Sequence, residues 1–237
     1  MKKVLFLSSF LIMVLFGSAQ ELVNKDINQV DNMGRRQGHW KAYDVNGKLK
    51  FEGRFDDNIP IGTFNYYYED GKLKAVSEMY DNGRRSRTKV YHNNGRLMAE
   101  GKYLEKKKDS TWTYYSDYDG VLLSTEFYQN GLLEGIVVNY YSTGNIAEEL
   151  PYEAGLKQGE WIRYFTDGKL KLKATYINDK LEGLMLVYHQ NGFPEVSGTY
   201  KNNLKDGMWF YFDDQGRETK NERYIRGYLK ETEVVEP

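Results

Sequence analysis

The feature that most constrains how this chain can fold is an internal repeat with a period of 24 residues. Each copy usually opens on a glycine, carries a tryptophan or another large residue two positions later and a tyrosine or phenylalanine three positions after that, and then reaches a second glycine. Six of the seven steps measure 24 residues and one measures 25, with copies opening at positions 38, 62, 86, 110, 135, 159, 183 and 207. A fixed period of this length indicates a repeat array in which each unit packs on its neighbours.

The first and sixth copies carry the pattern most completely. Their structural positions are Gly38, Trp40, Tyr43 and Gly47 in the first copy and Gly159, Trp161, Tyr164, Gly168 and Tyr176 in the sixth. The third copy has Ser86 and Thr88 in place of the opening glycine and the tryptophan, and the fourth has Ser110 in place of its glycine. The additional residue of the 25-residue step falls in 116–120 and predicts a lengthened turn there.

Each copy is predicted to form a β-hairpin. The second glycine usually follows Asn or Asp, and these dipeptides supply the positive φ angles of tight hairpin turns. After the turn, apolar residues alternate with charged ones, so one face of the sheet is expected to be apolar and the other solvated. A glycine recurs within the apolar series, at Gly53, Gly101 and Gly198, and is expected to leave room for a neighbouring ring.

The strand before the turn leaves two interpretations open. Trp161 and Tyr164 lie three residues apart, so they cannot both point the same way from an unbroken strand. Either a bulge interrupts the strand, or aromatic side chains point to both faces. The whole pattern predicts an all-β fold, an elongated twisted meander of about eight 24-residue β-hairpin repeats.

The repeat resembles the MORN-repeat variant of bacterial proteins, and the resemblance covers roughly residues 34–231. In the first copy it is carried by Gly38, Trp40, Tyr43, Gly47, Gly53 and Phe55. The resemblance implies an elongated, twisted sheet of successive hairpins. Some bacterial members are labelled antitoxin components, and eukaryotic relatives are linked to scaffolding and to membrane lipids; these links are analogies, because a repeat type does not fix a function.

The first residues are typical of an export signal. Lys2 and Lys3 precede an apolar run over 4–16, and small residues end at Ala19, so a signal peptide over 1–19 is predicted to be cleaved after Ala19. The alternative, a retained membrane anchor, is disfavoured because the run is short for a membrane span and is interrupted by serines.

The remaining chain divides into three predicted segments: a flexible leader over 20–33, the repeat array over 34–231 and an acidic tail over 232–237. Export places the array in the periplasm or outside the cell, with no retained transmembrane helix. The chain has no cysteine, so disulfides and thiolate metal sites are excluded.

No catalytic arrangement is predicted, and neither a metal nor a cofactor. The three histidines, which fall in different repeats and are expected to be exposed edge residues, are His39, His92 and His189. Three glutamates share one register and predict a solvated ladder rather than an acid–base pair: Glu52, Glu100 and Glu149. Serines lie in no nucleophile elbow, and the glycines punctuate hairpins rather than build a phosphate loop. The sequence therefore predicts a protein that is not an enzyme.

Charge is balanced overall but concentrated locally. The net charge is −1, which gives no argument for a nucleic-acid partner. Between positions 84 and 108, however, nine basic residues accompany two acidic ones. The candidate binding residues are the basic and off-register aromatic side chains of this middle region: Arg84, Arg85, Arg87, Lys89, Lys106, Lys107, Lys108, Tyr114 and Tyr118. A solvated face is the alternative interpretation of the same charges.

Three functions remain open from the sequence. The favoured hypothesis is an exported, non-enzymatic scaffold of the bacterial envelope whose extended surface binds another envelope protein. A second is binding of an anionic polymer, glycan or lipid through the basic, aromatic middle repeats. A third, which rests on the family resemblance alone, is an antitoxin or immunity role.

Overall fold

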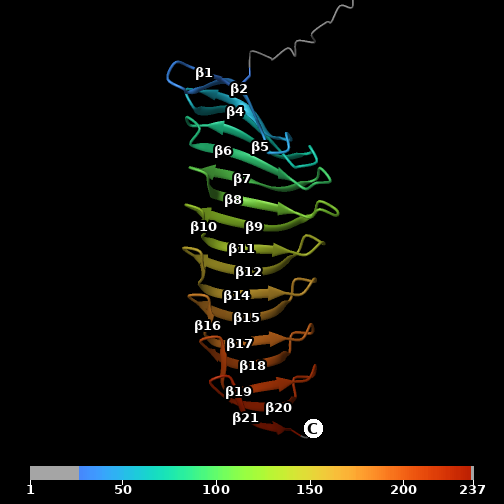
Figure 1. Ribbon diagram of the computed structural model, residues 1–237. Coiled ribbons are helices and arrows are strands. Elements are labelled where there is room, and N and C mark those ends of the chain that lie inside the picture. The colour runs from blue at the N-terminus through green and yellow to red at the C-terminus, as the bar shows by residue number, and fades with distance from the viewer. Residues whose placement is uncertain (1–26, 236–237) are drawn as a thin grey trace, which may run out of the picture.

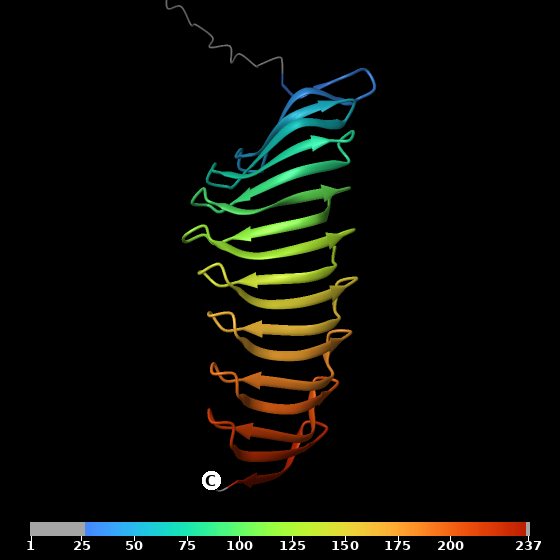
Figure 2. The same ribbon diagram turned by 180° about the vertical axis from the view of Figure 1, so that it is seen from behind.

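The protein is a single sheet that runs the length of the chain. The computed structural model describes residues 27–235 and contains 21 strands in one sheet. Successive antiparallel hairpins follow one another from β1 (Gln29–Val30) at one end to β21 (Tyr228–Val234) at the other (Figure 1). Seen from behind, the same ladder has turns along both long edges (Figure 2). Within the described residues no pairing joins the two ends, so the sheet is open, and the predicted all-β meander is confirmed.

The eight repeats each contribute one hairpin of two long strands. These pairs are β2 (Arg36–Tyr43) with β3 (Leu49–Asp56), β4 (Ile59–Tyr67) with β5 (Leu73–Tyr80), β6 (Arg85–Tyr91) with β7 (Leu97–Leu104), β8 (Lys107–Tyr115) with β9 (Leu122–Gln129), β11 (Gly135–Tyr140) with β12 (Ile146–Glu153), β14 (Gly159–Tyr164) with β15 (Leu170–Ile177), β17 (Gly183–Tyr188) with β18 (Pro194–Lys201), and β19 (Leu204–Phe212) with β20 (Glu218–Ile225). Three two-residue strands lead into later hairpins: β10 (Leu132–Leu133), β13 (Leu156–Lys157) and β16 (Lys180–Leu181). No helix long and apolar enough to cross a membrane occurs among the described residues.

The hairpin turns form where the Asn-Gly and Asp-Gly signals predicted them. Gly144 and Gly168 have backbone φ angles of 88° and 84°, which residues with a Cβ rarely adopt. In the ordinary turns a backbone N–H bonds the carbonyl four residues on, as from Asp44 to Lys48 at 2.8 Å. In the fourth repeat the bond spans five residues, from Ser116 to Val121 at 2.9 Å, so the lengthened turn is confirmed.

Both features that the sequence left open occur, in different strands of the hairpin. Arg163 pairs with Leu172 and Tyr164 with Leu170, so Lys171 is the extra residue of a β-bulge in the strand after the turn. Trp161 faces Ala174 on one face of the sheet, whereas the Tyr164 hydroxyl donates a hydrogen bond of 2.8 Å to Glu149. A bulge and a two-sided aromatic strand therefore occur together.

The glutamate ladder is a set of hydrogen-bond acceptors rather than a solvated row. The hydroxyl of the bulge tyrosine donates to the carboxylate of the preceding repeat, in Tyr67 to Glu52 at 2.6 Å and Tyr115 to Glu100 at 2.9 Å. Accepting this bond lowers the pKa of Glu52. The expectation of a simply solvated ladder was wrong, because strand alternation places a tyrosine on the same face of the sheet as each of these carboxylates.

A further set of hydrogen bonds links the turns of neighbouring repeats. The ring nitrogens Nε2 of His92 and His189 lie 3.1 Å and 3.0 Å from the carbonyl oxygens of Tyr115 and Phe212. Tyr68 occupies the same register and donates to the carbonyl of Tyr91 at 2.6 Å. His92 and His189 are therefore half-buried connectors, and the expectation that they are exposed edge residues was wrong.

Both ends of the array differ from the predicted boundaries. Residues 29–30 of the predicted leader form β1, which pairs with the start of β2. At the other end, β21 continues through Val234, so part of the predicted tail over 232–237 is a paired strand. The predicted signal peptide over 1–19 lies outside the described residues.

Candidate binding site in the third repeat

One face of the sheet carries all the fully buried aromatic rings, and we call it the ring face. In each repeat one residue of the first strand, the ring position, projects onto this face; the eight are Trp40, Phe64, Thr88, Trp112, Val137, Trp161, Met185 and Trp209. Directly across the hairpin lies the seat position, occupied by Gly53, Ser77, Gly101, Glu126, Leu150, Ala174, Gly198 and Glu222. Each seat residue except Glu222 also adjoins the ring position of the following repeat. The seat of a given ring is, from here on, the seat residue of the preceding repeat, as Ser77 is for position 88.

The seat glycines make room for the largest rings. A Cβ added to Gly53 would overlap the ring of Phe64, and one added to Gly101 or Gly198 would overlap the indole of Trp112 or Trp209. Trp112 and Trp209 are only 1% and 2% exposed, although the sheet has a single layer. The expectation that these glycines leave room for a neighbouring ring is confirmed.

A cation accompanies every tryptophan at the ring position. The residue four positions before the four tryptophans is Arg36, Lys108, Lys157 or Lys205. Lys205 Nζ lies 4.2 Å from the centre of the Trp209 ring and Lys108 Nζ lies 4.9 Å from that of Trp112. These contacts combine a cation–π attraction with apolar stems that cover the ring. We call this place the cation position.

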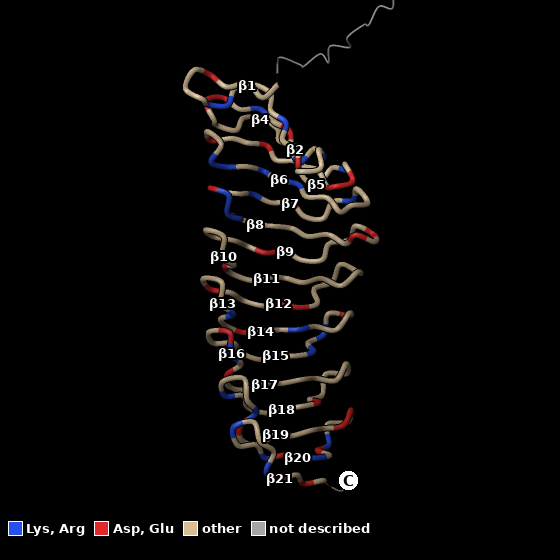
Figure 3. Tube along the Cα trace, in the orientation of Figure 1, with Lys and Arg blue, Asp and Glu red and all other residues tan. Residues whose placement is uncertain are grey.

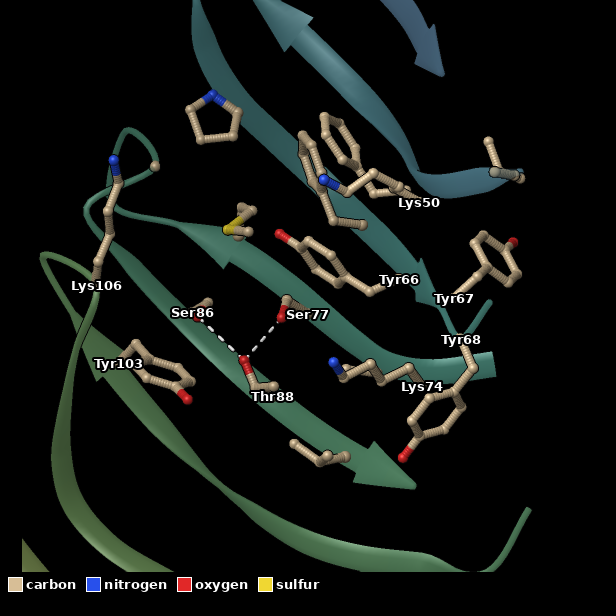
Figure 4. Close-up of a pocket in the computed structure, with 18 of the residues that line it drawn as sticks. Lys50, Tyr66, Tyr67, Tyr68, Lys74, Ser77, Ser86, Thr88, Tyr103 and Lys106 are labelled. Atoms are coloured by element: carbon tan, nitrogen blue, oxygen red, sulfur yellow. Dashed lines mark hydrogen bonds between the residues drawn. The ribbon is translucent and has the colours of Figure 1, made fainter. Parts of the chain in front are cut away.

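The third repeat departs from this arrangement. Thr88 stands where the other repeats have a ring or a large apolar residue, and Ser77 is its seat. The Thr88 hydroxyl shares hydrogen bonds of 2.8 Å with Ser77 and 3.2 Å with Ser86, and all three side chains are buried. Three small hydroxyl residues thus form the floor of a hollow of about 1510 Å³ on the ring face (Figure 4).

Aromatic residues form the walls of this repeat-three hollow. Phe64 and Tyr66 line it from the preceding hairpin and Tyr103 from its own. Burial raises the pKa values of Tyr66 and Tyr103, so both phenols are neutral hydrogen-bond donors at neutral pH. Neither hydroxyl bonds another residue within 27–235, which leaves both to a ligand.

The rim of the hollow is basic. Lys50, Lys74 and Lys106 are exposed and line it from three different strands or turns, as Figure 4 shows. The whole lining includes seven basic and three acidic residues, a net charge of +4. The acidic members are Asp44, Glu69 and Asp70. An apolar wall beside a few polar groups is typical of a ligand site, and the rim favours an anionic ligand.

The structure brings only some of the sequence-predicted residues to this hollow. Arg84, Arg85 and Lys106 line it. Arg84 is paired with Glu105 at 3.1 Å and Arg85 with Asp81 at 3.4 Å, and all four side chains are exposed by more than a third.

The other basic candidates are dispersed. Arg87 and Lys89 alternate with Ser86 and Thr88 along β6, so they project from the opposite face. Lysine and arginine cluster along β6 and at the turn between β7 and β8 in Figure 3. Strand alternation nevertheless sends the charges of Arg87 and Lys89 to the face opposite the hollow. Lys107 is exposed beside Gly131.

Lys108 and Tyr114 belong to the packing of the fourth repeat. Lys108 donates a hydrogen bond to the Tyr114 hydroxyl and contacts the rings of Trp112 and Tyr128. Burial lowers the pKa of Lys108 and raises that of Tyr114. Tyr118, by contrast, is 84% exposed in the lengthened turn.

Six residues that line the hollow are not among the sequence-predicted binding residues: Lys50, Tyr66, Lys74, Ser77, Ser86 and Tyr103. One signal was available, because Thr88 had been recognised as a replacement for tryptophan. A ring position without a ring implies a gap above its seat residue.

Comparisons with known proteins identify the repeat. The family model of the MORN repeat variant matches residues 36–57, 60–82, 133–154 and 157–178. No curated protein matches the sequence.

Solved structures resemble the chain only weakly. The structure described as TcdB2-TccC3-TEV has 13% identity and a TM-score of 0.21, covering 84% of this chain and 15% of that one. A porin-like protein from Bacteroides uniformis ATCC 8492 has 13% identity and a TM-score of 0.21, covering 75% of this chain and 90% of that one. TcdB2-TccC3-Cdc42 has 12% identity and a TM-score of 0.15, with coverages of 84% and 18%. Scores this low do not establish a shared fold.

The four matched segments coincide with hairpins of the observed sheet, β2–β3, β4–β5, β10–β12 and β13–β15. The third repeat, which supplies Ser86 and Thr88 of the floor, lies between matched segments, whereas Ser77 lies in the matched segment 60–82. These comparisons give no support to an antitoxin or immunity role. The matched segments show that the chain carries repeats of the MORN repeat variant at four positions within its open sheet of hairpins.

Proposed function

We propose that this protein is an exported, non-enzymatic scaffold that binds another protein of the bacterial envelope, with the repeat-three hollow as its main point of recognition. The observation that carries the proposal is the break at Thr88 in an otherwise continuous row of aromatic or apolar side chains at the ring position. At that break, hydroxyls, aromatic walls and basic side chains surround about 1510 Å³ of open space. A repeat scaffold offers a long surface, and its binding specificity comes from positions that depart from the repeat.

The chemistry of the floor favours binding over catalysis. The hydroxyls of Ser77, Ser86 and Thr88 bond one another, and no described histidine or carboxylate is bonded to them as a general base would be. Tyr66 and Tyr103 keep their protons at neutral pH, as tyrosines do at their ordinary pKa of 10, and burial raises both pKa values further. The site therefore supplies shape, hydrogen bonds and positive charge.

The export part of the proposal rests on the sequence of residues 1–19. N-terminal sequencing of protein recovered from cells should begin at or near Gln20. Intact Met1 on protein recovered from the cytoplasm would contradict export.

Crosslinking of the mature chain in envelope extract, followed by mass spectrometry, tests the binding. The rim variant carries Lys50→Glu, Lys74→Glu and Lys106→Glu, and the control carries Lys169→Glu, Lys171→Glu and Lys173→Glu on the sixth repeat. The rim variant should lose the crosslinked partner while the control keeps it. Equal loss from both variants would contradict the placement of the site.

A second candidate is an anionic glycan or lipid, favoured by the net charge of +4 around the hollow. Arrays of acidic glycans and of anionic lipid vesicles separate this candidate from the first. Binding there should weaken as salt rises, because exposed charges are screened over about 8–10 Å at physiological ionic strength. Capture of glycan or lipid without any protein partner would replace the first proposal with the second.

A further inference from the structure

The repeat-three hollow has the surroundings of a tryptophan ring but no ring. The eighth repeat shows these surroundings when they are filled. There, the indole of Trp209 covers the seat Gly198 and lies between the rings of Tyr200 and Tyr224, with centroids 5.1 Å and 6.4 Å away. Lys205 completes the enclosure from the cation position, 4.2 Å from the ring centre.

The corresponding residues of the third repeat all line the hollow. Counted from the ring position Thr88, they are Ser77 as the seat, Met79 and Tyr103 as the flanking residues and Arg84 at the cation position. A small seat, two flanking side chains and a cation are therefore kept, while the indole is absent.

Arg84 strengthens this correspondence. Among the eight cation positions, those before the four tryptophans are basic, and those before Phe64, Val137 and Met185 are Pro60, Leu133 and Leu181. Arg84 alone is a cation without a ring to cover. Its ion pair with Glu105 is exposed, with side-chain exposures of 59% and 64%, and such a pair holds a side chain only weakly. Arg84 can therefore turn toward a ring placed on Ser77.

We propose that the hollow receives an aromatic side chain of a partner polypeptide, best an indole, flanked in the partner by acidic residues. This inference rests on the proposed function and identifies what the partner inserts. The indole would lie over Ser77 and Thr88, between Met79 and Tyr103 and beneath Arg84, farther from the sheet than Trp209 because Ser77, unlike Gly198, carries a Cβ. Carboxylates beside it would meet the Lys50, Lys74 and Lys106 rim.

The observations favour an aromatic side chain over a sugar ring. A sugar stacks on one open aromatic face, whereas this site would flank a flat ring with the thioether of Met79 and the ring of Tyr103 and place a cation above it, contacts that favour an aromatic ring. Buried aromatic anchors of this kind provide most of the affinity in many protein interfaces.

The sharpest test fills the site from within. Thr88→Trp, made together with Ser77→Gly so that the seat carries no Cβ, places the protein's own indole at the ring position and restores the arrangement of the eighth repeat. Met185→Trp, made together with Ala174→Gly, adds an indole to another repeat in the same way and serves as the matched control. These two double variants are written Thr88→Trp and Met185→Trp below. Arg84→Gln removes the cation from an exposed position, so it tests the same site without altering the packed floor.

The probe is the capped peptide Asp-Glu-(5-fluoro-Trp)-Glu-Asp, followed by ¹⁹F NMR and calorimetry against residues 20–237. Wild type and Met185→Trp should broaden and shift the fluorine signal equally. Thr88→Trp should weaken the affinity at least tenfold, and Arg84→Gln several-fold. The same peptide with alanine in place of the fluorotryptophan should lose most of its affinity.

Equal binding of the alanine peptide would show that charge alone is recognised and would overturn the inference. So would unchanged affinity for Thr88→Trp, or tighter binding of an acidic oligosaccharide that displaces the peptide. If wild type and Thr88→Trp capture the same envelope protein equally well, the proposed function stands and this inference fails. If neither captures a protein while the peptide binds as expected, the proposed function fails instead.

Discussion

The third and eighth repeats are built on the same register, yet one is hollow and the other is filled. Both have a small seat residue, Ser77 or Gly198, and both have a cation four positions before the ring position. The decisive difference is Thr88 in place of Trp209. In the eighth repeat the ring position is filled by an indole that is 2% exposed, and in the third it is held by Thr88, 5% exposed, at the floor of the hollow.

The comparison shows that this sheet can lose a core ring at one place without losing its hairpins. Because each hairpin contacts mainly its two neighbours, a weakened repeat affects the array locally. A buried tryptophan removes about 200 Å² from water, worth roughly 5 kcal/mol at 25 cal/mol per Å². The third repeat gives up a contribution of this size and retains a binding surface.

The largest expected effect comes from emptying the eighth repeat. Trp209→Ala should lower the free energy of unfolding by about 3–5 kcal/mol, because it removes a fully buried ring and leaves a cavity. Thr88→Ala should cost only about 1 kcal/mol, the value of a typical hydrogen bond. Urea unfolding followed by tyrosine fluorescence measures both. Similar losses for the two variants would contradict the view that the third repeat is already without its core.

The next effect concerns the seat. Gly198→Val should cost about 3 kcal/mol, because its side chain would overlap the Trp209 ring and overpacking of this kind forces the ring to move. Ser77→Val, in the hollow repeat, should cost about 1 kcal/mol through its lost hydrogen bond to Thr88. Thermal unfolding of the two variants provides the comparison, and a costlier Ser77→Val would show that the hollow is tightly packed.

Acid should loosen the eighth repeat but not the third. Hydrogen bonds from Lys220, Tyr211 and Tyr224 lower the pKa of Glu222 to about 2, whereas its counterpart in the third repeat is Gly101. Because the pKa falls on folding, the stabilisation is fully present above the ordinary glutamate value of 4.5 and is lost as the pH drops toward about 2.

Charge-assisted hydrogen bonds of this kind contribute about 1.5–3 kcal/mol. Hydrogen exchange between pH 5 and pH 2.5, corrected for intrinsic rates, should show β19 and β20 losing protection, and Glu222→Gln should remove that dependence. Equal loss of protection in β6 and β7 would assign the acid sensitivity elsewhere.

The smallest expected effect separates two filled repeats. The indole N–H of Trp112 donates to the carbonyl of Lys102 at 2.9 Å, whereas that of Trp209 is buried without a hydrogen-bond partner among residues 27–235. Trp112→Phe should therefore cost about 1 kcal/mol more than Trp209→Phe, because only the first removes a hydrogen bond. Equilibrium unfolding of both variants under identical conditions measures the difference, and the reverse order would show that Trp209 gains a partner in solution.

The sequence was sufficient for the parts of the fold that follow local rules. Positive φ at Gly144 and Gly168, the longer turn over 116–120 and the space at Gly53 all depend on residues within one or two hairpins. Period and turn chemistry therefore predicted the array correctly.

The binding site depends on relations between hairpins and was predicted only in part. Arg87 and Lys89 were grouped with Lys106 because they are near it in sequence, although strand alternation places them on the opposite face. Tyr66 and Tyr103 come from different repeats and meet at the hollow only because the seat and ring positions of adjacent hairpins adjoin. Thr88 was noticed as an exception, but its consequence required the three-dimensional neighbours.

The fit between each seat and the ring that covers it also limits how this gene can change its length. A recombination that removed the seventh repeat would keep the 24-residue period and join the sixth hairpin to the eighth. Trp209 would then lie on Ala174, whose Cβ would occupy the space that Gly198 leaves empty. Duplications and deletions of whole repeats therefore differ in their effect on packing, even when they preserve the reading frame and the period. Those that preserve the packing keep each seat residue next to the ring that covers it.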